Sequence, residues 1–336
     1  VYATGWIQVL ATPILGITAL LIFSERLIML GLFDATKGGD PLLYQHLFWI
    51  YSHPAVYIMI LPAMGVISEI IPVFARKPIF GYNMIAFSSL AIAFAGSLVW
   101  AHHMFTSGMS DTAVLVFSFL TFVVAIPSAI KVFNWLSTLY QGSISLDPPL
   151  LYALGFIFMF SIGGLTGLVL GAAGTDIHVH DTYFVVAHYH YVIFGGTGLG
   201  MFAAMHYWFP KVFGRMYDHG RAAWSFWLIL IGMNVLYFPM FIMGLQGMPR
   251  RYYDYLPQYA PMQMVSTWGS WFLAAGLILM FWNLYRGCRY GPRATKNPWG
   301  GATLEWTLPT PLPHEAFHHD PVAPEPYDYK GVNPDG

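Results

Sequence analysis

The sequence predicts an all-α protein, a polytopic bundle of transmembrane helices, and its composition and its hydropathy pattern both support this fold class. Of the 336 residues, 57% are hydrophobic and only 9% are charged, whereas roughly a quarter of an average soluble domain is charged. Apolar runs of about 18 or more residues recur, and the alternating pattern of a β-barrel does not. A single cysteine and a net charge of −1 argue against a disulfide scaffold and against a nucleic-acid partner.

Eight apolar stretches are long enough to cross a membrane, and packed neighbours in a bundle tolerate the Pro and Gly residues inside them. They lie at about 5–24, 42–74, 83–101, 112–139, 148–172, 183–210, 221–246 and 261–286. We therefore expect a transmembrane bundle over 1–290 and a Pro-rich, polar tail over 291–336. Because the first apolar run is a full span, we expect no signal peptide. The tail histidines His314, His318 and His319 are expected to be solvated rather than metal-bound.

Basic residues predict the orientation of the bundle. If the eight spans alternate, ten of the fifteen basic residues lie on the side of the C-terminal tail. These ten are Arg76, Lys77, Lys211, Arg215, Arg221, Arg286, Arg289, Arg293, Lys296 and Lys330. Positive charge collects on the cytoplasmic side of membrane proteins, so the tail is expected to be cytoplasmic.

Five of the thirteen histidines fall within or at the ends of predicted spans: His53, His102, His103, His188 and His190. Ionisable groups in a membrane are costly and usually mark functional sites. One such histidine is explained about equally well by an interhelical hydrogen bond. Five of them in paired patterns favour a set of ligands.

Helix geometry sharpens this interpretation. Residues at i and i+2 are rotated by roughly 200°, so His188 and His190 point to opposite sides of one helix and can serve two cofactors. His53 and Tyr57, at i and i+4, share a face. Neutral imidazole is a favoured ligand for copper, iron and zinc. Three histidines without a thiolate suit a redox-active copper with an open position, and the phenol of Tyr57 can supply a proton or an electron.

These motifs resemble subunit I of the haem-copper oxygen reductases, the cytochrome c oxidase family. The segments that carry the resemblance are 38–41 (Gly-Gly-Asp-Pro), 53–54 (His-Pro), 100–103 (Trp-Ala-His-His), 130–133 (Ile-Lys-Val-Phe), 180–183 (His-Asp-Thr-Tyr), 186–191 (Val-Ala-His-Tyr-His-Tyr) and 247–252 (Gly-Met-Pro-Arg-Arg-Tyr). The family's subunit has twelve spans, and these eight resemble its last eight. The first four would then lie on a separate chain or outside the given sequence, together with the second axial ligand of the low-spin haem.

The resemblance implies a ligand for each metal. His53, His102 and His103 would ligate copper. His188 would be the axial ligand of a high-spin haem, expected to be A-type, where O₂ binds. His190 would hold a low-spin haem on the other face of the same helix.

Further residues gain roles from the same resemblance. Tyr57 would be the tyrosine that is cross-linked to a copper-ligating histidine. Tyr189 would pack between the haems, although simple core packing explains it equally well. Arg250 and Arg251 stand on the side that is poor in positive charge, where haem propionates would give them carboxylate partners; ordinary solvation of a loop is the alternative.

A magnesium site is also implied, formed by His180 and Asp181 and shared with subunit II, since hard oxygen ligands suit Mg²⁺. Asp176, in the same loop, would lie near a propionate. The lone Cys288 has no partner, so an electron-entry copper centre with thiolate ligands is expected on subunit II rather than on this chain.

Lys131 is the only basic residue deep in a predicted span. A buried lysine can relay protons, although its side chain could instead extend to the membrane surface. The family has a lysine at this motif position in a proton channel, and Ser128 and Ser68 match polar positions of that path. The resemblance therefore implies a route from Ser68, Lys131 and Ser128 to Tyr57.

One departure from the common family pattern concerns a second proton channel. Many members carry Glu two residues after the copper-ligating histidine, but this chain has Ala55. Tyr51 and Ser52 stand nearby, as in a bacterial subgroup that uses a Tyr-Ser pair in place of the glutamate. Hydroxyls can pass a proton but hardly store one near neutral pH.

The expected function is a proton-translocating terminal oxidase of a bacterial cytoplasmic membrane, which reduces O₂ to water. The expected partners are subunit II, subunit III, small subunits, membrane lipid and cytochrome c. A quinol-fed oxidase and a nitric oxide reductase are alternatives within the superfamily. A metal or ion transporter lined by histidines is an alternative of another class.

Overall fold

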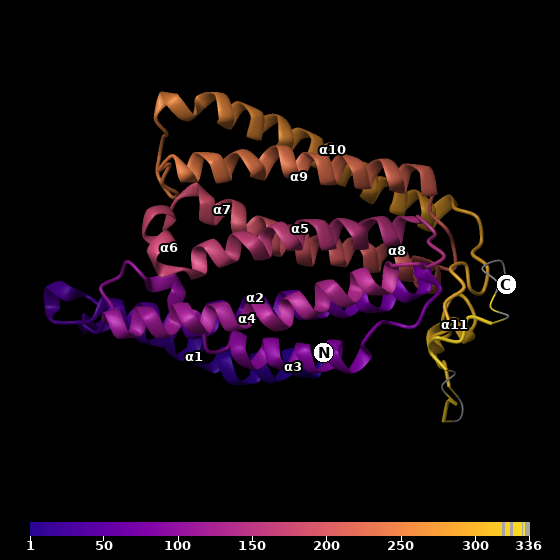
Figure 1. Ribbon diagram of the computed structural model, residues 1–336, viewed down its shortest axis with the longest axis horizontal. Coiled ribbons are helices and arrows are strands. Elements are labelled where there is room, and N and C mark those ends of the chain that lie inside the picture. The colour runs from indigo at the N-terminus through magenta and orange to yellow at the C-terminus, as the bar shows by residue number, and fades with distance from the viewer. Residues whose placement is uncertain (318–319, 323–324, 331, 333–336) are drawn as a thin grey trace.

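The computed structural model describes residues 1–317, 320–322, 325–330 and 332. The tail residues His318 and His319 therefore lie outside the described residues. The elements are α1 (Tyr2–Ile28), η1 (Ala35–Lys37), α2 (Pro41–Ala75), α3 (Tyr82–Gly96), η2 (Trp100–Met104), α4 (Asp111–Leu139), α5 (Pro148–Gly171), α6 (Ala173–Val179), α7 (Tyr183–Tyr189), η3 (His190–Gly198), α8 (Leu199–Phe213), α9 (His219–Leu245), η4 (Pro257–Tyr259), α10 (Ala260–Tyr290) and α11 (Leu304–Thr307). No strand element occurs in this part of the chain, and the long helices run side by side along one axis (Figure 1), as the predicted all-α bundle requires.

Seven helical segments in the described residues are long and apolar enough to cross a membrane. They include seven of the eight predicted spans. The remaining predicted span, 183–210, is an unbroken helical path made of α7, η3 and α8, in which η3 is a π-helix. Glycines permit this irregular stretch to pack closely: a Cβ on Gly195 would lie 2.6 Å from Met159 Cβ. Short π-helical stretches often occur at functional sites, and this one begins at His190.

Capping residues set where the site-bearing helices begin. The carboxylate of Asp40 accepts a hydrogen bond of 2.8 Å from Leu42 N, and Pro41 occupies the first position of α2. Ser110 and Asp218 cap α4 and α9 in the same way. Such caps satisfy backbone N–H groups that have no partner inside the helix.

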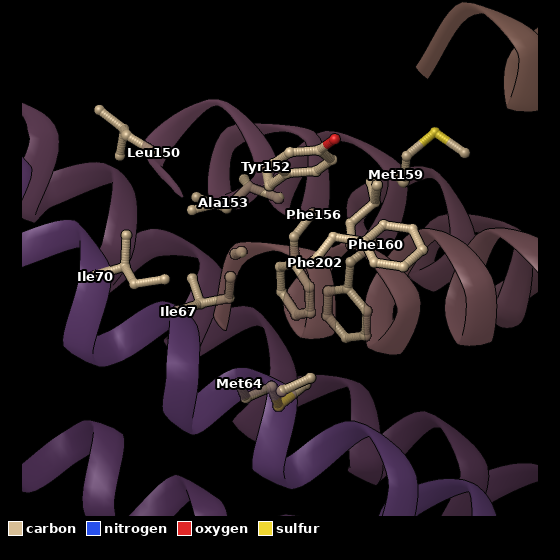
Figure 2. Close-up of a cluster of buried hydrophobic side chains, with 14 of the residues drawn as sticks. Met64, Ile67, Ile70, Leu150, Tyr152, Ala153, Phe156, Met159, Phe160 and Phe202 are labelled. Atoms are coloured by element: carbon tan, nitrogen blue, oxygen red, sulfur yellow. The ribbon is translucent and has the colours of Figure 1, made fainter. Parts of the chain in front are cut away.

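The core lies between α2, α5 and α8 (Figure 2), where large apolar side chains from the three helices meet. Ile67 of α2 and Phe156 of α5 are fully buried, and Phe202 of α8 is 3% exposed. Close approach of α8 to α2 depends on Gly200, whose added Cβ would lie 2.8 Å from Ala63 Cβ. Small residues at such crossings let helix backbones approach, which is how helices pack when lipid surrounds them.

The part of the tail around α11, residues 291–317, packs on one end of the bundle (Figure 1). Trp306 Nε1 donates to Tyr207 Oη at 2.7 Å, and Trp299 Nε1 donates to the Tyr207 carbonyl at 2.8 Å. Arg76 donates to the Trp299 carbonyl, and Lys211 donates to the Leu308 carbonyl. The contacts of these two basic residues place the predicted basic ends of α2 and α8 on the tail's side of the bundle.

Two glycines determine how closely α9 and α10 pack. A Cβ on Gly269 of α10 would lie 2.3 Å from Leu236 N, and one on Gly232 of α9 would lie 2.4 Å from Leu273 N. Because these neighbours are backbone atoms, they cannot move aside without separating the helices. We therefore expect Gly269→Ala to destabilise the purified complex by about 1–3 kcal/mol, measured as a lower thermal midpoint.

Gly164→Ala is the matched control, since nothing lies within 4 Å of a Cβ at that position. Equal midpoints for the two variants would contradict the proposed close packing of α9 on α10.

Candidate metal centre

Three imidazoles converge between α2 and η2. His53 Nδ1 lies 3.0 Å from His103 Nε2, and His102 Nε2 lies 3.1 Å from the same atom. One nitrogen from each ring falls within 4.8 Å of the other two, and His53 is 6% exposed. The sequence expectation that these residues form one cluster thus agrees with their placement, and the cluster has the donor set of a three-histidine metal site.

Two neighbours that the sequence analysis missed orient this cluster. Thr121 Oγ1 of α4 lies 3.0 Å from His102 Nδ1, which leaves His102 Nε2 to face the other rings. The indole of Trp49 stacks on the His103 ring, with centroids 3.7 Å apart and planes 9° apart. Trp49 precedes His53 by four residues on α2. Because positions i and i+4 share a helix face, this spacing could have predicted that Trp49 lies beside the cluster.

The ring nitrogen of His53 that does not take part in the convergence is unsatisfied. His53 Nε2 is buried and has no hydrogen-bond partner among the described residues. Tyr57 lies beside it, with ring centroids 4.9 Å apart, and Gly96 makes room because a Cβ there would lie 2.5 Å from Tyr57 Cε2. A buried nitrogen without a partner costs free energy, so this ring is built for more than packing. The three converging nitrogens fit a copper ion.

His188 is held with one nitrogen free. Its Nδ1 lies 3.0 Å from the Gly163 carbonyl and 3.2 Å from Thr166 Oγ1, both on α5. A Cβ on Gly167 would come within 3.0 Å of His188 Cε1. When Nδ1–H donates to a carbonyl, the neutral ring presents the lone pair of Nε2, as metal-ligating histidines do.

His188 also lies at about the depth of the three-histidine cluster. Two glycines bring the helical segment that carries His188 against α2. A Cβ on Gly196 would lie 2.6 Å from Ile60 Cδ1, and one on Gly200 would lie 2.8 Å from Ala63 Cβ. These two contacts show that the segment 183–213 runs parallel to α2 with a fixed offset. His188 precedes Gly196 by eight residues and His53 precedes Ile60 by seven, so helical segments of comparable length separate the two histidines from this contact and put them at a similar level.

His190 faces a different helix from His188. Its Nδ1 lies 2.8 Å from the Val186 carbonyl, and its ring stacks on Tyr237 of α9 with centroids 4.2 Å apart and planes 15° apart. The two histidines therefore face α5 and α9 respectively, which agrees with the rotation expected for i and i+2. Tyr189 between them is 37% exposed.

Asp181, a predicted magnesium ligand, forms ion pairs with Arg250 and Arg251, which were expected to bind haem propionates. Arg250 Nε lies 2.9 Å and Arg251 Nη1 lies 3.6 Å from Asp181 Oδ1. The backbone supports the pair, since Arg250 N donates to the Asp181 carbonyl at 2.9 Å and Tyr183 N donates to the Met248 carbonyl at 2.9 Å. The predicted magnesium ligand and the predicted propionate ligands thus form one ion-paired unit.

His180 pairs with Asp176 rather than with its sequence neighbour. Its Nδ1 lies 2.7 Å from Asp176 Oδ2, and the Asp176 residue is 3% exposed. This hydrogen bond raises the pKa of His180 above its usual value. It also leaves Nε2 free, in the carboxylate–histidine arrangement that supports metal ligands.

The residues of the predicted proton route are not joined by hydrogen bonds in the described structure. Lys131 Nζ instead donates to Ser89 Oγ at 2.7 Å and to the Ile85 carbonyl at 3.0 Å, both on α3. Ser68 Oγ donates to the Met64 carbonyl. Ser128 Oγ donates to a carbonyl of its own helix at 3.1 Å.

Sequence reasoning missed Ser89, although the Ser88-Ser89 pair inside an apolar span was a signal. Tyr51 and Ser52 are half-buried on α2, within one turn before His53.

Comparison with known proteins gives consistent matches. The family model described as cytochrome c and quinol oxidase polypeptide I matches residues 1–272. A cytochrome c oxidase subunit 1 from Synechocystis sp. is 48% identical over 332 residues, which are 97% of this chain and 60% of that protein. One from Cereibacter sphaeroides is 42% identical, over 96% of this chain and 57% of that protein. The chain thus spans about 60% of the length of these relatives.

A solved structure shares the fold. The cryo-EM structure of a heme-copper terminal oxidase dimer matches with a TM-score of 0.70 at 22% identity, covering 98% of this chain and 61% of that chain. At this identity the match shows that the two chains share a fold.

Thr121 generates a prediction for the metal centre. Thr121→Val removes the hydroxyl that orients His102 and nearly keeps the side-chain volume. Loss of such an orienting partner usually lowers metal affinity about 10–100-fold. We expect a matching rise in the rate at which a chelator removes metal from the purified complex, measured by elemental analysis. Ser128→Ala is the control on the same helix, and equal metal loss from both variants would contradict this role.

Proposed function

Because this chain belongs to the cytochrome c and quinol oxidase polypeptide I family, we propose that it is the catalytic core of a respiratory terminal oxidase that reduces O₂ to water. One observation carries the proposal: three imidazole nitrogens converge on α2 and η2, and His188 lies on the neighbouring parallel helix at a similar depth. Within this one buried region, the three imidazoles would hold a copper ion and His188 would hold a haem iron.

The residues divide into ligands and supporting groups. We propose that His53, His102 and His103 hold copper and that His188 and His190 hold a high-spin and a low-spin haem. When bound, the haem and copper supply the electrons and the open coordination positions that O₂ reduction needs. Tyr57 contributes a phenol O–H beside the copper ligands, from which a proton can be donated.

The finer cofactor assignments extend this proposal. We infer an A-type high-spin haem from the family resemblance. Arg250 and Arg251 are proposed to bind haem propionates while Asp181 balances their charge. His180 and Asp181 are proposed as magnesium ligands at the contact with subunit II. Asp181 would then exchange part of its ion pairing for the cation, which its 55% exposed side chain permits.

Partners and location follow from the same family membership. The chain is a multi-pass membrane protein. We propose that it lies in a bacterial cytoplasmic membrane with the tail cytoplasmic, that subunit II delivers electrons from cytochrome c, and that subunit III and small subunits complete the complex. The family description also names quinol oxidases, so a quinol donor is the second candidate.

Two other functions fit the site less well. A nitric oxide reductase would have no use for the tyrosine that lies beside His53. A transporter would need histidines along one path, but His188 and His190 face different helices and each has its Nδ1 on a backbone carbonyl. Proton uptake is proposed to pass through Lys131, with Ser68 and Ser128, to Tyr57, and Tyr51 and Ser52 are proposed as the hydroxyls of a second proton channel.

Metal and haem content tests the function directly. The purified complex should contain two haems and one copper, and it should consume O₂ when supplied with reduced cytochrome c. His190→Ala should remove one haem and leave copper in place, because that ligand faces away from the three-histidine cluster. Zinc in place of copper, or an absence of haem, would rule out the oxidase. O₂ uptake with a quinol alone would select the second candidate.

Lys131→Met should lower O₂ uptake by about 100-fold, because a positioned proton carrier typically contributes a factor of this order. Lys77→Met is the matched control, since Lys77 Nζ caps the Tyr140 carbonyl at the surface end of α4. Turnover of Lys131→Met equal to that of the control variant would exclude the route through Lys131.

A further inference from the structure

The amine of Lys131 is docked against α3 by two groups. Its Nζ lies 2.7 Å from Ser89 Oγ and 3.0 Å from the Ile85 carbonyl, and Lys131 is 2% exposed. Ser89 Oγ in turn lies 3.1 Å from the same carbonyl. The three polar atoms form a closed triangle inside an apolar helix interface.

The two partners of the amine differ in what they can do. A carbonyl only accepts hydrogen bonds, whereas a hydroxyl both donates and accepts. When Lys131 is an ammonium, it donates to Ser89 Oγ and to the Ile85 carbonyl, while the Ser89 hydroxyl donates to that carbonyl. When Lys131 is a neutral amine, the Ser89 hydroxyl can turn and donate to the lone pair of Nζ. Both partners can accept an N–H from either form, but only the Ser89 hydroxyl can also donate to the lone pair of the neutral amine.

The serines expected from the family resemblance are already engaged. Ser68 Oγ donates to the Met64 carbonyl and accepts from Trp135 Nε1 at 3.0 Å. Ser128 Oγ donates to the Val124 carbonyl. Among the described residues, Ser89 is the side chain that hydrogen-bonds to the Lys131 amine.

We propose that Ser89 is a positioning residue for proton uptake, whose hydroxyl keeps the Lys131 amine at α3 in both protonation states. The inference rests on the proposed role of Lys131 in the oxidase. Without the hydroxyl, the neutral amine has no donor for its lone pair and the ammonium loses one acceptor. The amine is then held less firmly at α3 in both states, and proton transfer through it slows.

The test compares three variants in the assembled complex. Ser89→Ala removes the hydroxyl, and Ser89→Thr keeps it at a half-buried position. Ser88→Ala is the matched control, because the Ser88 hydroxyl donates to the same Ile85 carbonyl at 2.8 Å but does not bond to Lys131. The readouts are the rate of haem reduction by excess reductant without O₂ and the solvent deuterium isotope effect on that rate.

We expect Ser89→Ala to slow haem reduction about tenfold, which corresponds to one lost hydrogen bond, and to raise the isotope effect because proton uptake becomes limiting. Ser89→Thr should stay within about twofold of the parent rate by retaining the hydroxyl, and Ser88→Ala should match the parent. If Ser89→Ala fails to retain haem, Ser89→Cys takes its place, since a thiol of similar size is a weak hydrogen-bonding group.

The inference would be overturned by equal slowing of the Ser88 and Ser89 variants, or by a Ser89→Thr variant as slow as Ser89→Ala. Lys131→Met separates this inference from the proposed function. If Lys131→Met reduces haem at the parent rate, the route through Lys131 fails. If Lys131→Met is slow while Ser89→Ala is normal, only the role of Ser89 fails.

Discussion

The structure depends on one constraint: an imidazole buried in this apolar bundle must be oriented by the group that its Nδ1 contacts, so that Nε2 faces a defined direction. His188 and His190 each place Nδ1 against a backbone carbonyl, and His102 places Nδ1 against Thr121. These bonds fix the ring orientations and leave Nε2 available on each ring. The convergence of His53, His102 and His103 is a preorganised donor set, because Thr121 orients the His102 ring and Trp49 stacks on the His103 ring.

Glycine makes these arrangements possible. Gly167 lies against His188 and Gly96 lies against Tyr57, so that a Cβ at either position would contact the ring. Gly196 and Gly200 bring the helix that carries His188 onto α2. Lipid gives helices little hydrophobic reason to associate, so contact at small residues determines the packing. The same residues that bring the helices together thus set the depth of the ligands.

At the end of the bundle opposite the tail, the carboxylate of Asp181 balances the positive charge of two arginines. Asp181 pairs with both Arg250 and Arg251, and the backbone bonds between the two loops hold the pair in register. The arginines retain N–H donors for anionic groups, while Asp181 reduces their mutual repulsion. Ser89 has a comparable supporting role for Lys131, since it satisfies a buried amine that would otherwise meet only carbonyl oxygen.

The sequence by itself determined the fold class, seven of the helices, the family and the residues of the three-histidine cluster. These features depend on local signals that can be read directly from the sequence. The signals are the apolar runs, the spacing of His188 and His190, and the adjacent His102 and His103. Only the tertiary structure decided that α7, η3 and α8 share one path, that Asp181 pairs with the arginines, and that Lys131 meets Ser89 rather than Ser68 or Ser128. These contacts join residues that are far apart in the chain, where spacing carries no information. Their geometry depends on how closely glycines let the helices pack, and that close packing is a property of the whole bundle.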